Sequence, residues 1–426
     1  MGAARQAAPW PSLAVVDEQG DFVPCLPDLR VATAAEYLYG PEWRSSRAVQ
    51  VINLCDTSRY LGPGYYVSLL AEARGHPPKP GPGTLADGQV EPVLGHARTA
   101  PPRRRYAKPG IAILHDADEP HGPSNQKALG HFIAAARHLG LRTGILTRED
   151  LGRLREFDAL FVRDHTALGH YTHAFIRRAE MAGMPVIDDS ASLYRCNNKV
   201  YLHELFARHG IPVPRTVVVH RGNRQEVSGQ LGFPCVLKRP DSSFSLDVFR
   251  VDSPADLHAG LDRLLEGSEM AIAQEWLPTE FDWRVGILDG RPLFACRYFM
   301  APGHWQIVSH TGAGRYVEGK TEAVSLAEVP SEVVQTALAA TRPIGSGFYG
   351  VDLKETDQGC VVMEVNDNPN VDAGNEDGVL KAALYREVMS VFARRIDEAR
   401  RGQATAADVS RPKASRQRVH AHPMDC

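Results

Sequence analysis

Two carboxylates and an amide lie at a fixed spacing in the segment from 347 to 370. Apolar and polar residues alternate on both sides of a turn centred on Gln358, which predicts a β-hairpin. In that register Asp352 lies directly opposite Glu364, and Asn366 shares their face because side chains alternate along a strand. The spacing therefore predicts that three oxygen-bearing side chains gather on one face of the hairpin.

These side chains are a candidate site for a divalent metal ion. Opposed residues in a hairpin have Cβ atoms about 4.5–5.5 Å apart, and like charges at that distance repel unless a cation lies between them. Carboxylate and amide oxygens suit Mg²⁺, which completes its shell with phosphate oxygens. The alternative is an exposed edge with solvated carboxylates, and Lys354, predicted opposite Val362, weakens the argument for a cation. The other face is predicted to be core and comprises Val351, Leu353, Val361, Met363 and Val365.

Two lysines earlier in the chain are candidates for binding phosphate. Lys238 ends an apolar strand and is followed by the polar turn PDSSFSLDVF. A lysine in that place can reach a nucleotide phosphate as a point charge, and backbone N–H groups of the turn can surround phosphate oxygens. The alternative is a surface hairpin that ends in a solvated lysine. Lys199 opens a predicted helix that leads into this region, although a lone helix lysine is usually exposed.

The segment from 269 to 300 carries a third group of polar residues. An apolar strand runs into Glu275 and Trp276, which suits a hinge that offers backbone groups to an adenine ring. The dipeptide Asp289-Gly290 further along is a strong signal for a two-residue hairpin.

The register of this second hairpin predicts a charged face. Arg284 lies opposite Ala295 and Asp282 lies opposite Arg297, so the three charged side chains share one face. Arginines bind carboxylates and phosphates through paired hydrogen bonds. The alternative is a cross-strand ion pair between Asp282 and Arg297 of small value. The other face is predicted to be core and comprises Trp283, Val285, Ile287, Phe294, Cys296 and Tyr298.

The elements that position these groups form several units. Residues 12–76 contain two apolar strands and a helix, and residues 111–195 alternate strands with helices, which predicts a parallel α/β sheet. Residues 196–400 turn to strands and hairpins between helices near 196–210, 253–265, 330–342 and 378–401. Residues 77–110, rich in proline and glycine, are predicted to be a linker, and residues 403–426 a disordered tail.

The composition and charge of the chain argue against several classes of protein. The chain has 426 residues, 43% of them hydrophobic and 23% charged, with a formal net charge of −3. That balance gives no reason to expect nucleic acid or a membrane surface as a partner, and no apolar run approaches the ~20 residues of a membrane span. The seven cysteines are scattered, which argues against disulfides and structural zinc. We expect a cytoplasmic protein and leave a homo-oligomer open.

In this order the motifs resemble the ATP-grasp superfamily, and most closely RimK-like ligases with an extra N-terminal RimK-like domain. The segment VINLCDTSRYLGPGYYVSLLAEARGH resembles that extra domain, and the Asp-x11-Glu-x-Asn spacing at 352–366 resembles the family's metal triad. The resemblance implies an α/β fold that is α+β in its ATP-grasp part. It comprises an N-terminal α/β domain at 12–76, a parallel-sheet pre-ATP-grasp domain at 111–195 and a two-lobed ATP-grasp domain at 196–400.

The resemblance also implies roles for individual residues. The nucleotide-binding residues are Lys199, Lys238, Glu275, Trp276 and Asp282. The residues near the substrate or the γ-phosphate are Arg284 and Arg297. The residues that hold Mg²⁺, with Mn²⁺ as the alternative, are Asp352, Glu364 and Asn366. One departure is the phosphate-binding turn, which in the family usually contains glycine and here contains none.

The predicted activity is an ATP-dependent carboxylate–amine ligase that forms an amide through an acyl phosphate. The resemblance implies that glutamate or another amino acid is joined to an amine, a peptide or a protein. One alternative is a nucleotide-binding subunit without ligase activity that acts through a partner. Another is an ATP-grasp kinase that releases a phosphorylated product.

Overall fold

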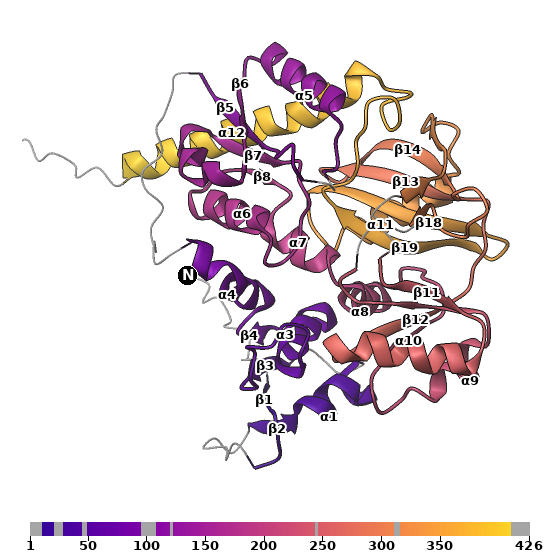
Figure 1. Cartoon of the computed structure of the whole chain (residues 1–426). Coiled ribbons are helices and arrows are strands. Elements are labelled where there is room, and N and C mark those ends of the chain that lie inside the picture. The colour runs from indigo at the N-terminus through magenta and orange to yellow at the C-terminus, as the bar shows by residue number, and fades with distance from the viewer. Residues whose placement is uncertain are drawn as a thin grey trace, which may run out of the picture.

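The chain folds into three successive units (Figure 1). The computed structural model describes residues 11–20, 29–44, 49–94, 108–119, 122–242, 246–310 and 316–409. The first unit is a parallel sheet whose strands follow the order β2 (Arg30–Thr33), β1 (Ser12–Val16), β3 (Gln50–Asn53), β4 (Pro78–Lys79).

Three helices follow the first strands of this unit: α1 (Ala34–Tyr39), α2 (Pro41–Arg44) and α3 (Pro63–Arg74). A capping box formed by Thr33 and Glu36 begins α1. Pro63 stands at the start of α3, and Gly75 ends it in the left-handed conformation, at φ 77°. The two predicted strands and the predicted helix of this unit are confirmed.

The prediction of a linker from 77 to 110 is wrong in its first part. Residues there form β4 and the helix α4 (Pro82–Leu94). Pro82 stands at the first helical position, where its missing N–H leaves no hydrogen bond unmade, and Pro78 lies in an edge strand. The prolines that hide the periodic pattern of this segment in the sequence therefore stand at the first residues of β4 and α4.

The second unit is the predicted parallel sheet, and its existence is confirmed. Its strands follow the order β6 (Arg142–Leu146), β5 (Gly110–Leu114), β7 (Ala159–Val162), β8 (Val186–Ile187). Ile111 and Ile113 point to one hydrophobic core, which also contains residues of α5 (Gln126–His138) and α12 (Ala382–Val409). Ala112 and Leu114 point to another, which includes residues of α6 (Tyr171–Met181). Helices thus cover both faces, as a parallel sheet requires.

The third unit has two lobes joined to the second unit by α7 (Ser190–Cys196) and α8 (Lys199–His209). The first lobe is an antiparallel sheet in the order β11 (Val248–Val251), β10 (Cys235–Lys238), β12 (Ala271–Glu275), β9 (Thr216–Val219). Its helices are α9 (Glu226–Leu231) and α10 (Pro254–Gly267).

The second lobe is a larger antiparallel sheet, and α11 (Ser331–Thr341) packs against it. Its strands follow the order β17 (Thr321–Val324), β14 (Arg291–Phe299), β13 (Phe281–Leu288), β18 (Phe348–Thr356), β19 (Gly359–Asp367). A separate ribbon pairs β15 (Val308–His310) with β16 (Tyr316–Glu318).

The register of the β18–β19 hairpin differs from the prediction near its turn. Lys354 pairs with Val361, and a bulge beside Leu353 then restores the predicted pairing of Asp352 with Glu364. Because of the extra residue, Val362 enters the core with 1% of its surface exposed. Met363 instead lines a cavity. The prediction of Val361 and Met363 as core residues is wrong for this reason.

The register of the β13–β14 hairpin is one residue away from the prediction. Arg284 pairs with Cys296, and Asp282 pairs with Tyr298, because a bulge next to Gly286 adds a residue to β14. A slip of one residue moves every side chain of a strand to the other face. Both faces of this sheet are buried, so apolar alternation alone could not fix the register.

The C-terminal helix is longer than predicted. The helix α12 continues to Val409, so the prediction of a structureless segment is wrong for 403–409, and the rest of the predicted tail lies outside the described residues. The five described cysteines are buried, and none of them forms a disulfide. No helix in the described ranges is long and apolar enough to cross a membrane.

The first unit packs against the first lobe of the third unit. Arg74, at the end of α3, binds Glu204 of α8 at 3.0 Å, and both side chains are buried. Tyr39 donates a hydrogen bond to Glu269 at 2.7 Å and stacks on His220 at a ring distance of 3.7 Å. These contacts fix the N-terminal unit to the lobe that carries α8 and Lys199.

Candidate functional site

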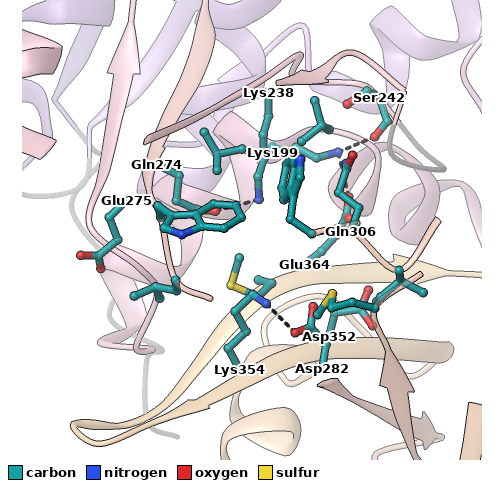
Figure 2. A pocket seen from close by; sticks show the side chains of 18 residues that line it. Lys199, Lys238, Ser242, Gln274, Glu275, Asp282, Gln306, Asp352, Lys354 and Glu364 are labelled. Atoms are coloured by element: carbon teal, nitrogen blue, oxygen red, sulfur yellow. Dashed lines mark hydrogen bonds and ion pairs between the residues drawn. The ribbon is translucent and has the colours of Figure 1, made fainter. Parts of the chain in front are cut away.

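A cleft opens between the two lobes of the third unit (Figure 2). Residues of α8, β10 and β12 line one side, and residues of β18 and β19 line the other. The space between the lobes, counted out to the surrounding solvent, is about 900 Å³. Polar and apolar side chains both face this space.

One end of the cleft is an apolar slot. Trp276 and Trp305 both line it, with their ring centres 5.0 Å apart. The guanidinium of Arg250 lies 4.6 Å from the Trp276 ring centre, which holds that ring in place. The aliphatic walls of the slot are formed by Val236, Val248, Leu277, Met300, Ile307 and Met363. A flat aromatic base is the kind of group that such a slot accepts.

The side chain of Glu275 points away from the cleft (Figure 2). Its carboxylate accepts hydrogen bonds from the backbone N–H and the Nε of Arg215, both at 2.7 Å. This side chain therefore fixes the strand end, and Glu275 offers only its backbone to a ligand in the slot, beside the ring of Trp276.

The two predicted phosphate lysines converge in the cleft (Figure 2). The Nζ of Lys199 lies 2.8 Å from a carboxylate oxygen of Glu364 and also donates to the carbonyl of Ser242. The Nζ of Lys238 donates to Oε1 of Gln274 at 2.7 Å. Burial lowers the pKa of Lys238 to about 8, and the neighbouring Lys199 and Lys354 act in the same direction, because removal from water and like charges both disfavour the charged form.

A third lysine lies in the same cleft. The Nζ of Lys354 lies 2.5 Å from Oδ1 of Asp282 and donates to the Thr279 hydroxyl at 2.6 Å. Asp282 thus balances the charge of Lys354, so this lysine does not oppose a cation at the neighbouring carboxylates in the way the sequence suggested. The ion pair between Asp282 and Arg297, considered as the alternative, does not form, because Asp282 pairs across the strands with Tyr298.

The predicted metal triad meets Arg284 at the far end of the cleft. The guanidinium of Arg284 binds Asp352 through two hydrogen bonds, at 2.5 and 2.9 Å. Asn366 donates its Nδ2 to Oδ2 of Asp352 at 3.0 Å. Burial raises the pKa of Asp352, and this effect exceeds the lowering of the pKa by the neighbouring Arg284 guanidinium. The pKa of Glu364 is lowered, because Lys199 and Lys238 outweigh its burial.

These residues fit a metal ion that also binds phosphate. Asp352 and Glu364 are paired across the hairpin and lie beside Asn366, which provides carboxylate and amide oxygens of the kind that Mg²⁺ binds. Within the described ranges, no group of three or more His, Cys, Asp or Glu side chains could hold a metal by itself. An ion here would need further oxygen ligands, and a nucleotide phosphate can supply them.

The structure does not bring Arg297 to the other predicted site residues. It pairs with Trp283, and its guanidinium lies 5.1 Å from the Trp283 ring centre and 5.0 Å from that of Phe281. Arg284 lies on the opposite face of the sheet and contacts the Tyr298 ring instead. The prediction that Arg284, Arg297 and Asp282 share a face is wrong for Arg297, because the bulge in β14 shifts the register.

A second cavity adjoins the cleft and shares Asp352 and Glu364 with it. Its open space is about 1,330 Å³. Loops of two units enclose it: Pro123, His165 and Thr166 come from the second unit, and the segment 366–376 comes from the third. The carboxylate pair therefore stands between the cleft and this second cavity.

Comparison with protein families agrees with this arrangement. A model of the RimK-like ATP-grasp N-terminal domain matches residues 34–101, and a model of the RimK-like ATP-grasp domain matches residues 196–384. Together the two matches span more than half of the chain. The chain belongs to the RimK-like ATP-grasp family.

Curated relatives of this RimK-like protein are ligases. It is 25% identical to a probable alpha-L-glutamate ligase of Pseudoalteromonas atlantica, over 56% of this chain and 76% of the relative. It is 27% identical to the alpha-aminoadipate–LysW ligase LysX of Saccharolobus solfataricus, over 56% of this chain and 88% of the relative. The chain is therefore placed among the ATP-dependent carboxylate–amine ligases, which form carbon–nitrogen bonds.

Solved structures share the fold. The D-alanine–D-alanine ligase of Bacillus anthracis aligns with a TM-score of 0.54 at 18% identity, over 69% of this chain and 99% of that one. The VanG D-Ala:D-Ser ligase of Enterococcus faecalis aligns with a TM-score of 0.52 at 18% identity, over 67% of this chain and 99% of that one. These likenesses confirm the mixed α/β ATP-grasp architecture of this RimK-like chain.

Sequence reasoning missed several residues of the site. Gln274 precedes the predicted hinge residues, and its side chain fixes Lys238. Trp305 closes the apolar slot from a loop that shows no pattern in the sequence. The charge balance of Lys354 with Asp282 depends on the pairing of β13 with β18, which are more than 50 residues apart in the chain. Only the position of Gln274, next to Glu275, offered a local signal.

Proposed function

We propose that this protein activates a carboxylate as an acyl phosphate and joins it to an amine. The carboxylate is that of glutamate or another amino acid, and the acceptor is an amine, a peptide or a protein. The names of the curated relatives, which refer to glutamate and to alpha-aminoadipate, support an amino-acid substrate. The cytoplasmic location and the homo-oligomer considered from the sequence stay predictions.

The observation that carries this proposal is the place of the carboxylate pair. Asp352 and Glu364 stand where the nucleotide cleft meets the second cavity, so phosphate from one side and substrate from the other would meet at this pair. Asp352, Glu364 and Asn366 would hold Mg²⁺, which offsets the charge of the β- and γ-phosphates when it is bound.

The lysines serve the first step. As the γ-phosphoryl group leaves ADP and bonds to a carboxylate oxygen, negative charge spreads over the transferring oxygens. Lys199 and Lys238 converge in the cleft on the side of the first lobe, and their ammonium groups stabilise that charge. Lys199 also ties Glu364 to the backbone at Ser242, which orients the carboxylate before ATP enters.

Arg284 serves the second step. An amine attacks the carbonyl carbon of the acyl phosphate, the carbon–oxygen bond to phosphate breaks, and the departing phosphate can take the proton that the amine loses. The carbonyl oxygen carries negative charge in the tetrahedral state, and a preorganised guanidinium stabilises it. Arg284 lines the second cavity and is held by Asp352, so its position is fixed in advance.

Nucleotide products test this proposal against the alternatives. The protein is incubated with Mg²⁺, ATP, glutamate and a set of amines, and ADP, AMP and orthophosphate are measured. We expect ADP and orthophosphate in equal amounts, formed only when carboxylate and amine are both present. AMP would indicate adenylation, and ADP without orthophosphate would indicate a kinase. Nucleotide binding without turnover would indicate a non-catalytic subunit, which the ligase relatives disfavour.

A further inference from the structure

The helix α3 of the first unit lies beside α8 of the third unit (Figure 1). Near the end of α3, the carboxylate of Glu72 faces this neighbouring region. It accepts hydrogen bonds from the Tyr194 hydroxyl at 3.0 Å, from the Nε of Arg195 at 2.9 Å and from the Tyr201 hydroxyl at 3.1 Å. Tyr194 and Arg195 belong to α7, whereas Tyr201 belongs to α8. One carboxylate of the first unit therefore contacts both helices.

The three donors are well placed to hold this carboxylate. Tyr194 is 6% exposed and Tyr201 is 1% exposed. Burial raises the pKa of both tyrosines, so their hydroxyls keep their protons and donate. Arg195 also donates to the carbonyl of Ile344 at 2.6 Å, in the segment that follows α11 of the second lobe. Through Arg195, the contact of Glu72 thus extends to the second lobe.

Lys199 lies in the chain between the residues that Glu72 contacts. It is the first residue of α8, and Tyr201 follows in the same turn. Residues two apart in an α-helix project about 200° away from each other, so Tyr201 can face the first unit while Lys199 faces the cleft. The backbone N–H of Lys199 donates to the carbonyl of Pro240 at 2.8 Å, at the start of the polar turn after β10. The position of Lys199 therefore depends on how the first turn of α8 is held.

A second contact of the first unit reaches the residues between α7 and α8. Asn197 donates from its Nδ2 to the Tyr60 hydroxyl at 3.4 Å. The next residue, Leu61, is fully buried and adopts the left-handed conformation at φ 56°, which is unfavourable for a residue with a side chain. Its carbonyl accepts from the backbone N–H of Glu269 at 2.9 Å. The loop before α3 is thus held in a strained form where it meets the start of α8.

The first unit is also joined to the second unit, by a contact that does not involve α8. Asp87 of α4 accepts hydrogen bonds from the Nε of Arg177 in α6 and, at 2.6 Å, from its Nη2. Neither residue lines the cleft or the second cavity. Docking of the first unit can therefore be disturbed at Asp87 without a direct effect on Lys199, and at Glu72 with one.

We propose that Glu72 is a positioning residue of the nucleotide site, through which the first unit holds Lys199 in the cleft. The inference rests on the proposed function, in which Lys199 stabilises the transferring phosphoryl group. With Glu72 in place, α7 and α8 keep one relative orientation, and the ammonium group of Lys199 is preorganised for phosphate. Without Glu72, part of the free energy of ATP binding is used to order the start of α8.

Calorimetry with two matched variants tests this inference. Glu72→Ala and Asp87→Ala each remove a carboxylate of the first unit that is paired with an arginine. A non-hydrolysable ATP analogue is titrated with Mg²⁺ into the full chain, at a temperature where melting curves show each variant to be folded. We expect Glu72→Ala to weaken binding about fivefold or more, and Asp87→Ala to stay within about twofold of wild type. Equal affinities in the two variants would overturn the inference.

A milder variant keeps the test available if Glu72→Ala does not fold. Glu72→Gln retains an oxygen that can accept from the two tyrosines and loses the charge that binds Arg195. It should weaken binding of the analogue about threefold, because charge-assisted hydrogen bonds are roughly twice as strong as neutral ones. An affinity equal to that of the wild-type chain would contradict the proposal.

A double-mutant cycle with Lys199→Ala shows whether Glu72 acts through this lysine. If it does, Glu72→Ala should change the affinity by less than about twofold in a chain that already lacks Lys199. A role in stability alone would weaken binding to the same degree in both backgrounds, and this result would contradict the proposal.

The outcome is separable from that of the ligase proposal. Calorimetry reports nucleotide binding without turnover, whereas trapping of the activated carboxylate by hydroxylamine reports the first step of the reaction. Weaker binding in Glu72→Ala without any trapping would support the positioning role and count against the ligase mechanism. Trapping, together with equal affinities of Glu72→Ala and Asp87→Ala, would support the ligase and reject the positioning role.

Discussion

The nucleotide cleft and the second cavity differ in their charged groups although they share four lining residues: Ser242, Ile307, Asp352 and Glu364. The cleft is lined by three lysines, Lys199, Lys238 and Lys354, and by the acidic residues Glu275, Asp282, Asp352 and Glu364. Six carboxylates and a single arginine line the second cavity among the described residues. Asp352 and Glu364 belong to both. The hairpin face that carries this pair therefore separates a cleft with three lysines from a cavity with none among its described lining residues.

The two regions also differ in how they are built. The cleft is built largely from regular strands and a helix, and its lysines lie at the end of β10, at the start of α8 and within β18. The second cavity is formed largely by loops from two units, which Asp188 joins by accepting hydrogen bonds from the backbone N–H groups of Phe348 and Asn368. A strand end is fixed by local sequence, whereas a cavity between loops depends on how the units dock.

The largest effect on turnover is expected at Glu364, which lines both the cleft and the second cavity. Glu364→Gln should lower the turnover of ATP by about 10² or more, because it removes a metal ligand and the partner of Lys199. The fold should persist, since the side chain of Glu364 is 28% exposed. Steady-state ADP release measures the loss, with Glu322→Gln as the control for charge removal. If the turnover rate of Glu364→Gln lay within a few-fold of the control rate, Glu364 would have no role in catalysis.

A substitution on the cleft side should affect the nucleotide alone. Lys238→Ala should weaken binding of a non-hydrolysable ATP analogue about tenfold or more, since a charge-assisted contact contributes ~1.5–3 kcal/mol. Lys320→Ala, at an exposed lysine of the second lobe, is the control for loss of a positive charge. Calorimetry with the analogue measures both affinities, and a Lys238→Ala affinity equal to that of Lys320→Ala would remove Lys238 from the nucleotide site.

The cleft should also show a pH dependence. Burial lowers the pKa of Lys238 to about 8 in the folded protein, from its ordinary value of 10.5, so nucleotide affinity should fall by several-fold as pH rises above about 8 and the lysine loses its charge. By the same linkage the nucleotide-free fold should gain stability between these two pKa values, where the unfolded chain binds the extra proton. The Lys238→Arg variant keeps its charge and should show a flat affinity profile; a parallel decline in both proteins would assign the effect to another group.

The smallest effect is expected at the arginine that the structure separates from the site. Arg297→Met should leave turnover within about twofold of wild type and lower stability by about 1 kcal/mol, since it loses stacking on Phe281 and Trp283. Arg284→Met should reduce turnover far more, because it removes the guanidinium from the second cavity and leaves Asp352 unpaired. Comparing the two rates at equal folded fraction tests the observed register: similar losses would favour the shared face predicted from the sequence.

Residues within single elements could be predicted from the sequence. The parallel sheet of the second unit, the pairing of Asp352 with Glu364 and the positions of Lys199 and Lys238 depend on periodicity and turn signals that act over short distances. The two hairpin registers depend on bulges at Gly286 and Leu353. Because both faces of that sheet are buried, a shifted strand still alternates apolar residues, and the pattern could not reveal the slip.

The second cavity could not be predicted for a different reason. Its wall combines His165 of the second unit with Glu318 and Glu376 of the third, and no local pattern links positions that far apart. The elements between 78 and 94 were missed because prolines at their starts look like the composition of a linker. Tertiary docking, and not local propensity, decides these parts of the structure.

Trapping with hydroxylamine tests the central claim most directly. The protein is incubated with Mg²⁺, ATP and glutamate, then with other amino acids and dicarboxylates, in the presence of hydroxylamine. The account predicts a hydroxamate, with one ADP and one orthophosphate formed for each and none without the carboxylate. AMP and pyrophosphate, or no carboxylate-dependent nucleotide turnover with any of these substrates, would contradict an acyl phosphate formed at the junction of Asp352 and Glu364.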